Sequence, residues 1–248
     1  MNFPSVRTVI LCFLLSIRLL PGSAYALDFR TVVCGGKKAT VCDVDLATDR
    51  LGLFWRDDAG QPLRNFDSLA KWQASGGKRL LFAMNAGMYE ADFSPVGLFV
   101  SEGKQLVPPN LKSGTGNFYL KPNGVFVITG GGAEIVESAR YREVSDRVML
   151  ATQSGPMLVI HGRVHPAFKP DSVSRLFRNG VGVTGSGRVI FAISDGPVNF
   201  YEFATLFRDC LKCTDALFLD GTVSSLYAPS LGRDDRKIDL GTMIGVVQ

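Results

Sequence analysis

Histidine is scarce in this chain of 248 residues, which contains only His161 and His165. A Ser-His-Asp hydrolase would need one of them as its base, and a zinc site built on the pair would lack a third nitrogen ligand. Gly162 lies between the two histidines and Pro166 follows them, so this segment is predicted to form a β-turn. The G-x-S-x-G and P-loop motifs are also absent. We therefore expect no metal and no cofactor.

Neither sign of charge dominates the chain. The sequence has 27 basic and 23 acidic residues, and two of the basic ones, Arg7 and Arg18, lie near the N-terminus. A nucleic-acid-binding or anionic-membrane-binding protein would show a basic stripe, so both partner classes are excluded.

Long apolar runs are missing beyond the first residues. The run 9–17 is preceded by Arg7 and followed by Ala24-Tyr25-Ala26, a small-x-small pattern that signal peptidase recognises. The alternative is a retained anchor, but Arg18 interrupts the run well short of the roughly 20 residues that span a bilayer. We predict a signal peptide at 1–26, cleavage after Ala26, no stable membrane insertion afterwards, and a periplasmic or secreted domain at 27–248.

Cysteine is present in an even number after residue 26: Cys34, Cys42, Cys210 and Cys213. In an exported chain an even count favours disulfides. Three pairings are possible, and we expect Cys34–Cys42 across a hairpin together with a local Cys210–Cys213 bridge. A zinc half-site or a redox motif at the C-x-x-C is the competing interpretation.

Glycine is abundant and evenly spread, with 27 residues, which is typical of many short strands joined by tight turns. The pattern predicts two helices, at 67–75 and 200–209, and a hairpin at Gly185-Ser186-Gly187. Many strands with few helices that do not alternate regularly indicate an α+β fold, a single domain with mixed multi-stranded sheet(s) and a few helices. The expected strands are 29–33, 41–45, 51–55, 80–84, 97–101, 124–129, 148–152, 157–160, 180–184, 189–193, 216–219 and 243–247.

Polar residues beside glycine stand at the ends of several apolar runs. Asn85 and Gly87 follow 80–84, Arg178 precedes 180–184, and Asp220-Gly221 follows 216–219. A buried strand that delivers an amide or a carboxylate to its end, next to glycine, lets a ligand approach the backbone closely. Each segment taken alone also fits a turn or a surface charge. Ser224 and Asn117 are weaker members of the same set.

Read together, these segments resemble the bacterial branch of the phosphodiester glycosidase family. The resemblance rests on six ordered motifs: MNAGMY (84–89), SPVGLFV (94–100), GNFYLKPNGVF (116–126), TQSGPMLV (152–159), RNGVGV (178–183) and LFLDGTVSSLY (217–227). Members of this family are similar in their core to the enzyme that removes N-acetylglucosamine from a phosphodiester on mannose. The chain departs from many relatives at Ala86-Gly87, Asn179 and Gly221-Thr222, which bears on the identity of the sugar.

The resemblance implies roles for individual residues. Asp220 and Asn85 would be catalytic, and Arg178 would hold the phosphate. Asp220 would stabilise an oxocarbenium-like centre or activate water, while Arg178 would neutralise the charge on the departing phosphate. A phosphate monoester leaves with little protonation, which fits a single prominent carboxylate in place of the usual two. The other substrate-binding residues implied are Gly87, Asn117, Gly221 and Ser224.

Hydrolysis of the glycosidic bond in sugar-1-phosphodiesters of cell-envelope or exopolysaccharide glycans is therefore the expected function. Two alternatives stay open. One is a non-catalytic periplasmic module that binds glycans or anionic sugars, and the other is a phosphodiesterase that cuts the P–O bond.

Overall fold

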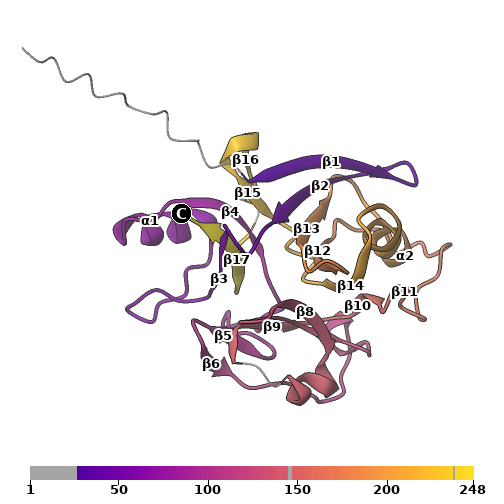
Figure 1. The fold of residues 1–248 in the computed structure, drawn as a ribbon, viewed down its shortest axis with the longest axis horizontal. Coiled ribbons are helices and arrows are strands. Elements are labelled where there is room, and N and C mark those ends of the chain that lie inside the picture. Colours follow the sequence, from indigo (N-terminus) through magenta and orange to yellow (C-terminus); the bar gives the residue numbers. More distant parts are fainter. Residues whose placement is uncertain (1–26, 145–146, 237) are drawn as a thin grey trace, which may run out of the picture.

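Three β-sheets and two α-helices make up the part of the chain that the computed structural model describes, residues 27–144, 147–236 and 238–248 (Figure 1). The predicted signal peptide lies outside these residues. Every strand pair in them is antiparallel, and the helices are α1 (Phe66–Ser75) and α2 (Phe200–Thr205). The predicted α+β single-domain class is confirmed. No helix of the described residues is long and apolar enough to cross a bilayer.

Sheet I has seven strands in the order β1-β2-β13-β12-β14-β10-β11. Its central strands are buried along most of their length because both faces are covered, by α2 on one side and by the other sheets on the other. The predicted hairpin at 185–187 joins β12 to β13. The bounds are β1 (Asp28–Cys34), β2 (Lys37–Val44), β10 (Met157–Ile160), β11 (Arg163–Val164), β12 (Asn179–Thr184), β13 (Val189–Ser194) and β14 (Cys213–Phe218).

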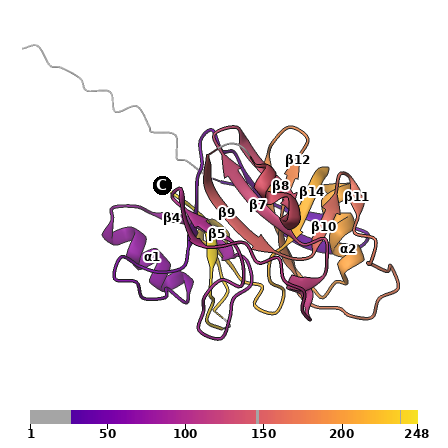
Figure 2. The same ribbon diagram turned by 90° about the horizontal axis from the view of Figure 1, so that it is seen from below.

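Sheets II and III have five strands each. Sheet II has the order β16-β15-β4-β17-β3, and sheet III has the order β6-β5-β9-β7-β8. Seen from below, sheet III crosses in front of sheet I while α1 and α2 lie at opposite sides (Figure 2). The bounds are β3 (Arg50–Phe54), β4 (Leu80–Asn85), β15 (Leu226–Ala228), β16 (Arg233–Asp234) and β17 (Met243–Val247) for sheet II, and β5 (Phe99–Ser101), β6 (Lys104–Val107), β7 (Gly124–Thr129), β8 (Gly132–Glu137) and β9 (Val148–Ser154) for sheet III.

The three sheets meet around the ring of Phe191 on β13. Its centroid lies 5.3 Å from that of Phe82 on β4 and 6.2 Å from that of Phe126 on β7. All three rings are fully buried. Each buried phenylalanine contributes about 1.5–3 kcal/mol of transfer free energy. The main core therefore fixes how the ends of β4 and β12 approach each other, and that junction carries the candidate site.

Each helix begins at an asparagine cap. Asn65 accepts the Ser68 N–H before α1, and Asn199 forms a reciprocal capping box with Glu202 at the start of α2. The predicted second helix continues past α2 as a π-helical turn over Leu206–Cys210. This turn places Cys210 beside the end of β1.

The disulfide pairing predicted from the sequence is wrong. Cys34 is bonded to Cys210, with a Cα–Cα distance of 6.2 Å, and Cys42 and Cys213 are buried free thiols. The expected β1–β2 hairpin exists, but Cys34 pairs with Lys37, five residues from Cys42 along β2, or about 17 Å. Cys213 begins β14, and its buried thiol packs against Gly182.

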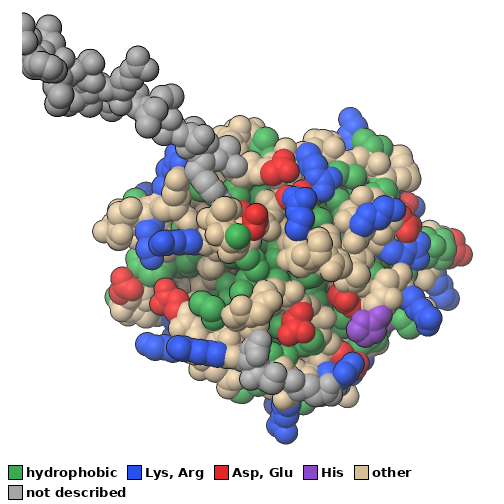
Figure 3. All heavy atoms as spheres, in the orientation of Figure 1, with side chains coloured by type: hydrophobic (Ala, Val, Ile, Leu, Met, Phe, Trp, Pro, Cys, Tyr) green, Lys and Arg blue, Asp and Glu red, His purple; other side chains and the backbone are tan. Residues whose placement is uncertain are grey.

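On the face shown in Figure 3, basic and acidic side chains are interspersed and do not gather in one patch. This agrees with the balanced charge of the sequence.

The first prediction concerns the cysteines. Chain 27–248, unfolded without reductant, is expected to give two titratable thiols, and Cys34→Ser is expected to cost about 3–5 kcal/mol because the bridge closes a very long loop. Thiol titration and urea unfolding measure the two values. Cys42→Ala is the matched control and should lower the thiol count by one without breaking the bridge. Four thiols, or none, would contradict the pairing.

Candidate functional site

Two buried asparagine amides join sheet II to sheet I. Asn85 ends β4, and Asn179 begins β12. The Asn179 Nδ2 atom donates to the backbone oxygen of Asn85 at 2.9 Å and to its Oδ1 atom at 3.0 Å. Both residues are at most 1% exposed. An unpaired amide at such a depth would cost about 1–3 kcal/mol, so the pair fixes the junction between the two sheets.

The loop that follows β14 is fastened to this amide pair. The Asp220 N–H donates to Asn179 Oδ1 at 3.1 Å, and Asn85 Nδ2 donates to the Asp220 carbonyl at 2.9 Å. Farther along the loop, the Ser225 N–H donates to Asn85 Oδ1 at 2.9 Å. The hydroxyl of buried Ser224 makes only long contacts, at 3.4 Å to the Asp220 carbonyl and 3.5 Å to Asn179 Oδ1. The amides thus define the backbone position of Asp220.

The carboxyl group of Asp220 is held less tightly than its backbone. Its Oδ1 atom accepts the Thr222 N–H at 3.2 Å. Burial raises the pKa of Asp220 to about 6, and the Thr222 bond opposes this only in part. Burial, followed by the charge of Asp220, also raises the pKa of Tyr89, so the phenol and the carboxyl lie within electrostatic range. A carboxyl with a pKa near 6 is suited to proton transfer or charge stabilisation near neutral pH.

Arg178 is the largest fully buried side chain in the described residues. Its Cζ atom lies 3.6 Å from the centre of the Phe200 ring. Its Nε atom donates to the Val198 carbonyl at 3.0 Å and its Nη2 atom to the Ser174 carbonyl at 3.3 Å, whereas Nη1 has no partner in the described part of the chain. Burial lowers its pKa to about 10. The guanidinium is thus a buried cation, and one of its nitrogens, Nη1, has no hydrogen-bond partner in the described residues.

Sequence comparison identifies the family. A family model described as "Phosphodiester glycosidase" matches residues 78–247, which include Asn85, Arg178, Asn179 and Asp220. The chain belongs to the phosphodiester glycosidase family.

Relatives of this phosphodiester glycosidase domain agree in sequence or fold. The protein YigE of Escherichia coli, itself uncharacterized, is 33% identical over 232 residues, which cover 94% of this chain and 91% of YigE. The catalytic domain of zebrafish N-acetylglucosamine-1-phosphodiester alpha-N-acetylglucosaminidase has a similar fold, with a TM-score of 0.60 and 15% identity over 89% of this chain and 81% of that domain. A Burkholderia pseudomallei protein described as exported gives a TM-score of 0.52 and 13% identity over 85% and 74% of the two chains.

Within the phosphodiester glycosidase domain, the predicted site residues separate into two groups. Asn85, Asp220 and Ser224 come together, as described above. Arg178 precedes Asn179 in the chain, but its guanidinium packs on Phe200 of α2, whereas the Asn179 amide turns toward sheet II. Asn117 is exposed on a short turn, and its carbonyl lies near Gly155 and not beside the Asn85–Asn179 pair.

Gly87 and Gly221 are packed against protein. A Cβ atom on Gly87 would lie 2.6 Å from the Gln153 carbonyl, and one on Gly221 would lie 2.8 Å from the Phe218 ring and 3.0 Å from the Phe177 carbonyl. Such distances require glycine for the close approach of neighbouring segments. The open space for a sugar that glycine suggested in the sequence is therefore not found directly above these two Cα atoms.

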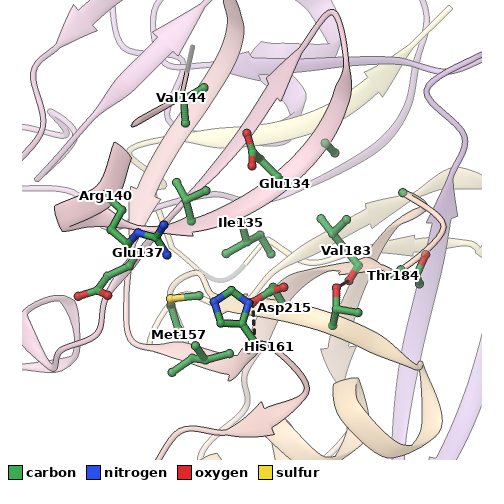
Figure 4. Close-up of a pocket in the computed structure, with 16 residues that line it drawn as sticks. Glu134, Ile135, Glu137, Arg140, Val144, Met157, His161, Val183, Thr184 and Asp215 are labelled. Carbon is green, nitrogen blue, oxygen red and sulfur yellow. Dashed lines mark hydrogen bonds and ion pairs between the residues drawn. The ribbon is translucent and has the colours of Figure 1, made fainter. Parts of the chain in front are cut away.

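One sizeable hollow in the described residues lies away from this cluster. It is a cleft of about 670 Å³ between β8 of sheet III and the strands β10, β12 and β14 of sheet I (Figure 4). Asp215 lies in it and accepts the His161 N–H at 2.9 Å. Asp215 lies near the start of β14, and the loop that carries Asp220 follows the end of the same strand. It provides a matched control for Asp220.

Three participants had no role assigned to them from the sequence: Asn179, Tyr89 and Ser154. The Ser154 hydroxyl donates to the Leu219 carbonyl at 2.6 Å and holds the chain just before Asp220. Asn179 and Tyr89 lie inside the quoted motifs RNGVGV and MNAGMY, so the motifs contained the signal. Their roles were hidden because their partners are remote in sequence, 94 residues away for Asn179 and Asn85.

The second prediction follows from the pKa of Asp220. The folded state binds this proton more tightly than the unfolded chain, so the stability of the wild type falls as the pH rises from about 4 to about 6. Asp220→Asn removes this penalty. The melting temperature of the variant minus that of the wild type is therefore expected to be larger at pH 7.5 than at pH 3.5.

Calorimetry at both pH values measures the difference. Asp209→Asn is the control of opposite sign, because Arg208 lowers the pKa of Asp209. Its effect should be small, since that ion pair is exposed. A pH-independent difference for Asp220→Asn would show that Asp220 is not buried as described.

Proposed function

We propose that this protein hydrolyses the glycosidic bond of sugar-1-phosphodiesters, with Asp220 as the catalytic carboxylate. The observation that carries the proposal is the Asn85–Asn179 pair, which holds Asp220 in place within the family's matched region while its pKa is raised to about 6. The fold is shared with an enzyme whose name specifies an N-acetylglucosamine-1-phosphodiester. That sugar is the first to test, together with other sugar-1-phosphodiesters of envelope and exopolysaccharide glycans.

In the reaction, the bond between C1 of the sugar and the phosphate oxygen breaks and water supplies the new C1 hydroxyl. The bonding electrons leave with the phosphate, which departs as a monoester. The ionised Asp220 carboxylate either activates the water or stabilises the positive charge at C1. Asn85 is a positioning residue in this scheme, because both of its amide protons are directed to protein oxygens.

Arg178 is the proposed phosphate-binding residue. A buried cation without a carboxylate partner is costly, and its Nη1 donor is unused, so an anion would satisfy both the charge and the donor. The Phe218 ring lies 5.6 Å from the guanidinium and also borders Gly221. The Phe218 ring is thus a neighbour of both the guanidinium and the Asp220 loop. We also propose that the protein works in the periplasm or outside the cell, which its long-range disulfide and an exported structural relative support.

The third prediction tests Asp220. Asp220→Asn is expected to lower kcat/KM by about 10²–10⁴-fold while substrate still binds, and Asp215→Asn to leave it unchanged. Because the carboxylate is the active form, wild-type kcat/KM should rise with pH through about 6. A falling profile would make Asp220 a general acid.

Hydrolysis in ¹⁸O-labelled water distinguishes the alternatives. Label in the sugar supports glycosidic cleavage, whereas label in the phosphate identifies a phosphodiesterase that cuts the P–O bond. Binding without turnover across a panel of sugar-1-phosphodiesters would identify a non-catalytic binding module.

The fourth prediction tests Arg178. Inorganic phosphate is expected to raise the melting temperature of the wild type and not that of Arg178→Lys, because lysine cannot present the forked guanidinium donors. Arg175→Lys is the matched control, since Arg175 lies three residues away and is paired with Glu202 at 2.6 Å. Equal stabilisation of all three proteins would restrict Arg178 to a structural role.

A further inference from the structure

Residues 170–177, here called the apolar loop, display large hydrophobic side chains to solvent. Val173 is 93% exposed, Leu176 50% and Phe177 41%. These are three of the nine exposed large hydrophobic residues in the described part of the chain, within five consecutive positions. Clustered exposed hydrophobic side chains mark a surface that contacts another molecule more often than scattered ones do.

The apolar loop is firmly anchored from beneath. Buried Asn199 donates to the carbonyls of Pro170 and Ser172, both at 3.0 Å, and Arg178 donates to that of Ser174. Leu176 forms a two-way backbone bridge with Val198. Two fully buried polar side chains, Asn199 and Arg178, thus donate hydrogen bonds to the backbone of this loop. Its hydrophobic side chains are exposed on a fixed backbone, which is a preorganised contact surface.

The apolar loop adjoins the candidate site at Arg178 and at Gly221. Its last residue, Phe177, precedes Arg178, and the Phe177 carbonyl borders Gly221, next to Asp220. The substrate phosphate that Arg178 would hold carries two ester groups, the sugar and a second alcohol. With the sugar C1 at Asp220, the second alcohol would leave the phosphate along the apolar loop.

We propose that the apolar loop binds the second ester group of the substrate and selects phosphodiesters in which that group is a hydrocarbon chain. The inference rests on the proposed function and narrows it to sugar phosphates esterified to an apolar alcohol. The one basic side chain of residues 173–177, Arg175, is paired with Glu202, which leaves the apolar side chains as the dominant chemistry of this stretch.

The test compares two N-acetylglucosamine-1-phosphodiesters that differ only in the alcohol, methyl or octyl, the latter below its micelle concentration. The wild type should prefer the octyl diester by 10-fold or more in kcat/KM. The triple variant Val173→Ser, Leu176→Ser, Phe177→Ser should reduce this preference to within 2-fold and keep the rate on the methyl diester. Leu106→Ser, Met149→Ser, Leu231→Ser, which changes three exposed residues elsewhere, should keep the preference.

An equal rate on both diesters in the wild type would overturn the inference and leave the proposed reaction intact. If neither diester is cleaved, the proposed reaction is wrong for this sugar, and calorimetric affinities then decide whether the octyl diester is preferred. Cosedimentation with phosphatidylethanolamine–phosphatidylglycerol vesicles measures whether the loop binds membrane lipid instead. Vesicle binding that the triple variant abolishes, without an octyl preference, would assign the loop to membrane lipid and overturn the proposal.

Discussion

The hydrogen-bonded pair Asn85–Asn179 is the contact on which the candidate site depends. It joins the end of the central strand of sheet II to the start of the central strand of sheet I, 94 residues apart in the sequence. Each amide also binds the chain around Asp220, so one buried contact sets both the junction of the sheets and the position of the carboxylate. Such a network is costly when one member is lost, because its partners are then buried without hydrogen bonds.

The amide pair explains why Asp220 tolerates an unfavourable environment. Burial disfavours the ionised carboxyl, and only one N–H, from Thr222, offsets this. The loop stays in place because its backbone is fastened at Asp220 and Ser225. Burial can therefore disfavour the ionised form of the Asp220 carboxyl group without unfolding the loop. Separation of backbone anchoring from side-chain solvation is a means by which a protein maintains a perturbed pKa at a functional position.

The sequence predicted what local pattern determines and missed what long-range contacts determine. The apolar strands β7, β10 and β17 were placed with their observed bounds. The short strands β15 and β16 were missed because their pairing partners, not their own residues, make them strands. The Cys34–Cys210 bridge depends on where the π-helical turn packs against β1, which spacing along the chain does not reveal. Of the polar residues that the sequence places at strand ends, Asn85 and Asp220 lie together, whereas the Arg178 guanidinium packs on Phe200, a contact that the strand pattern does not reveal.

Arg178 poses the sharpest energetic question in the molecule. Anchoring the apolar loop requires only neutral donors, and Asn199 supplies two of them from a fully buried position. A guanidinium in the same role adds the free-energy cost of desolvating a charge. Stacking on Phe200 offsets this cost only in part. A neutral amide side chain would supply such donors at lower cost, so the charge itself needs a purpose that the isolated chain does not provide. An anionic group at Nη1 provides one, and it would connect phosphate binding directly to the carbonyls that fix the apolar loop.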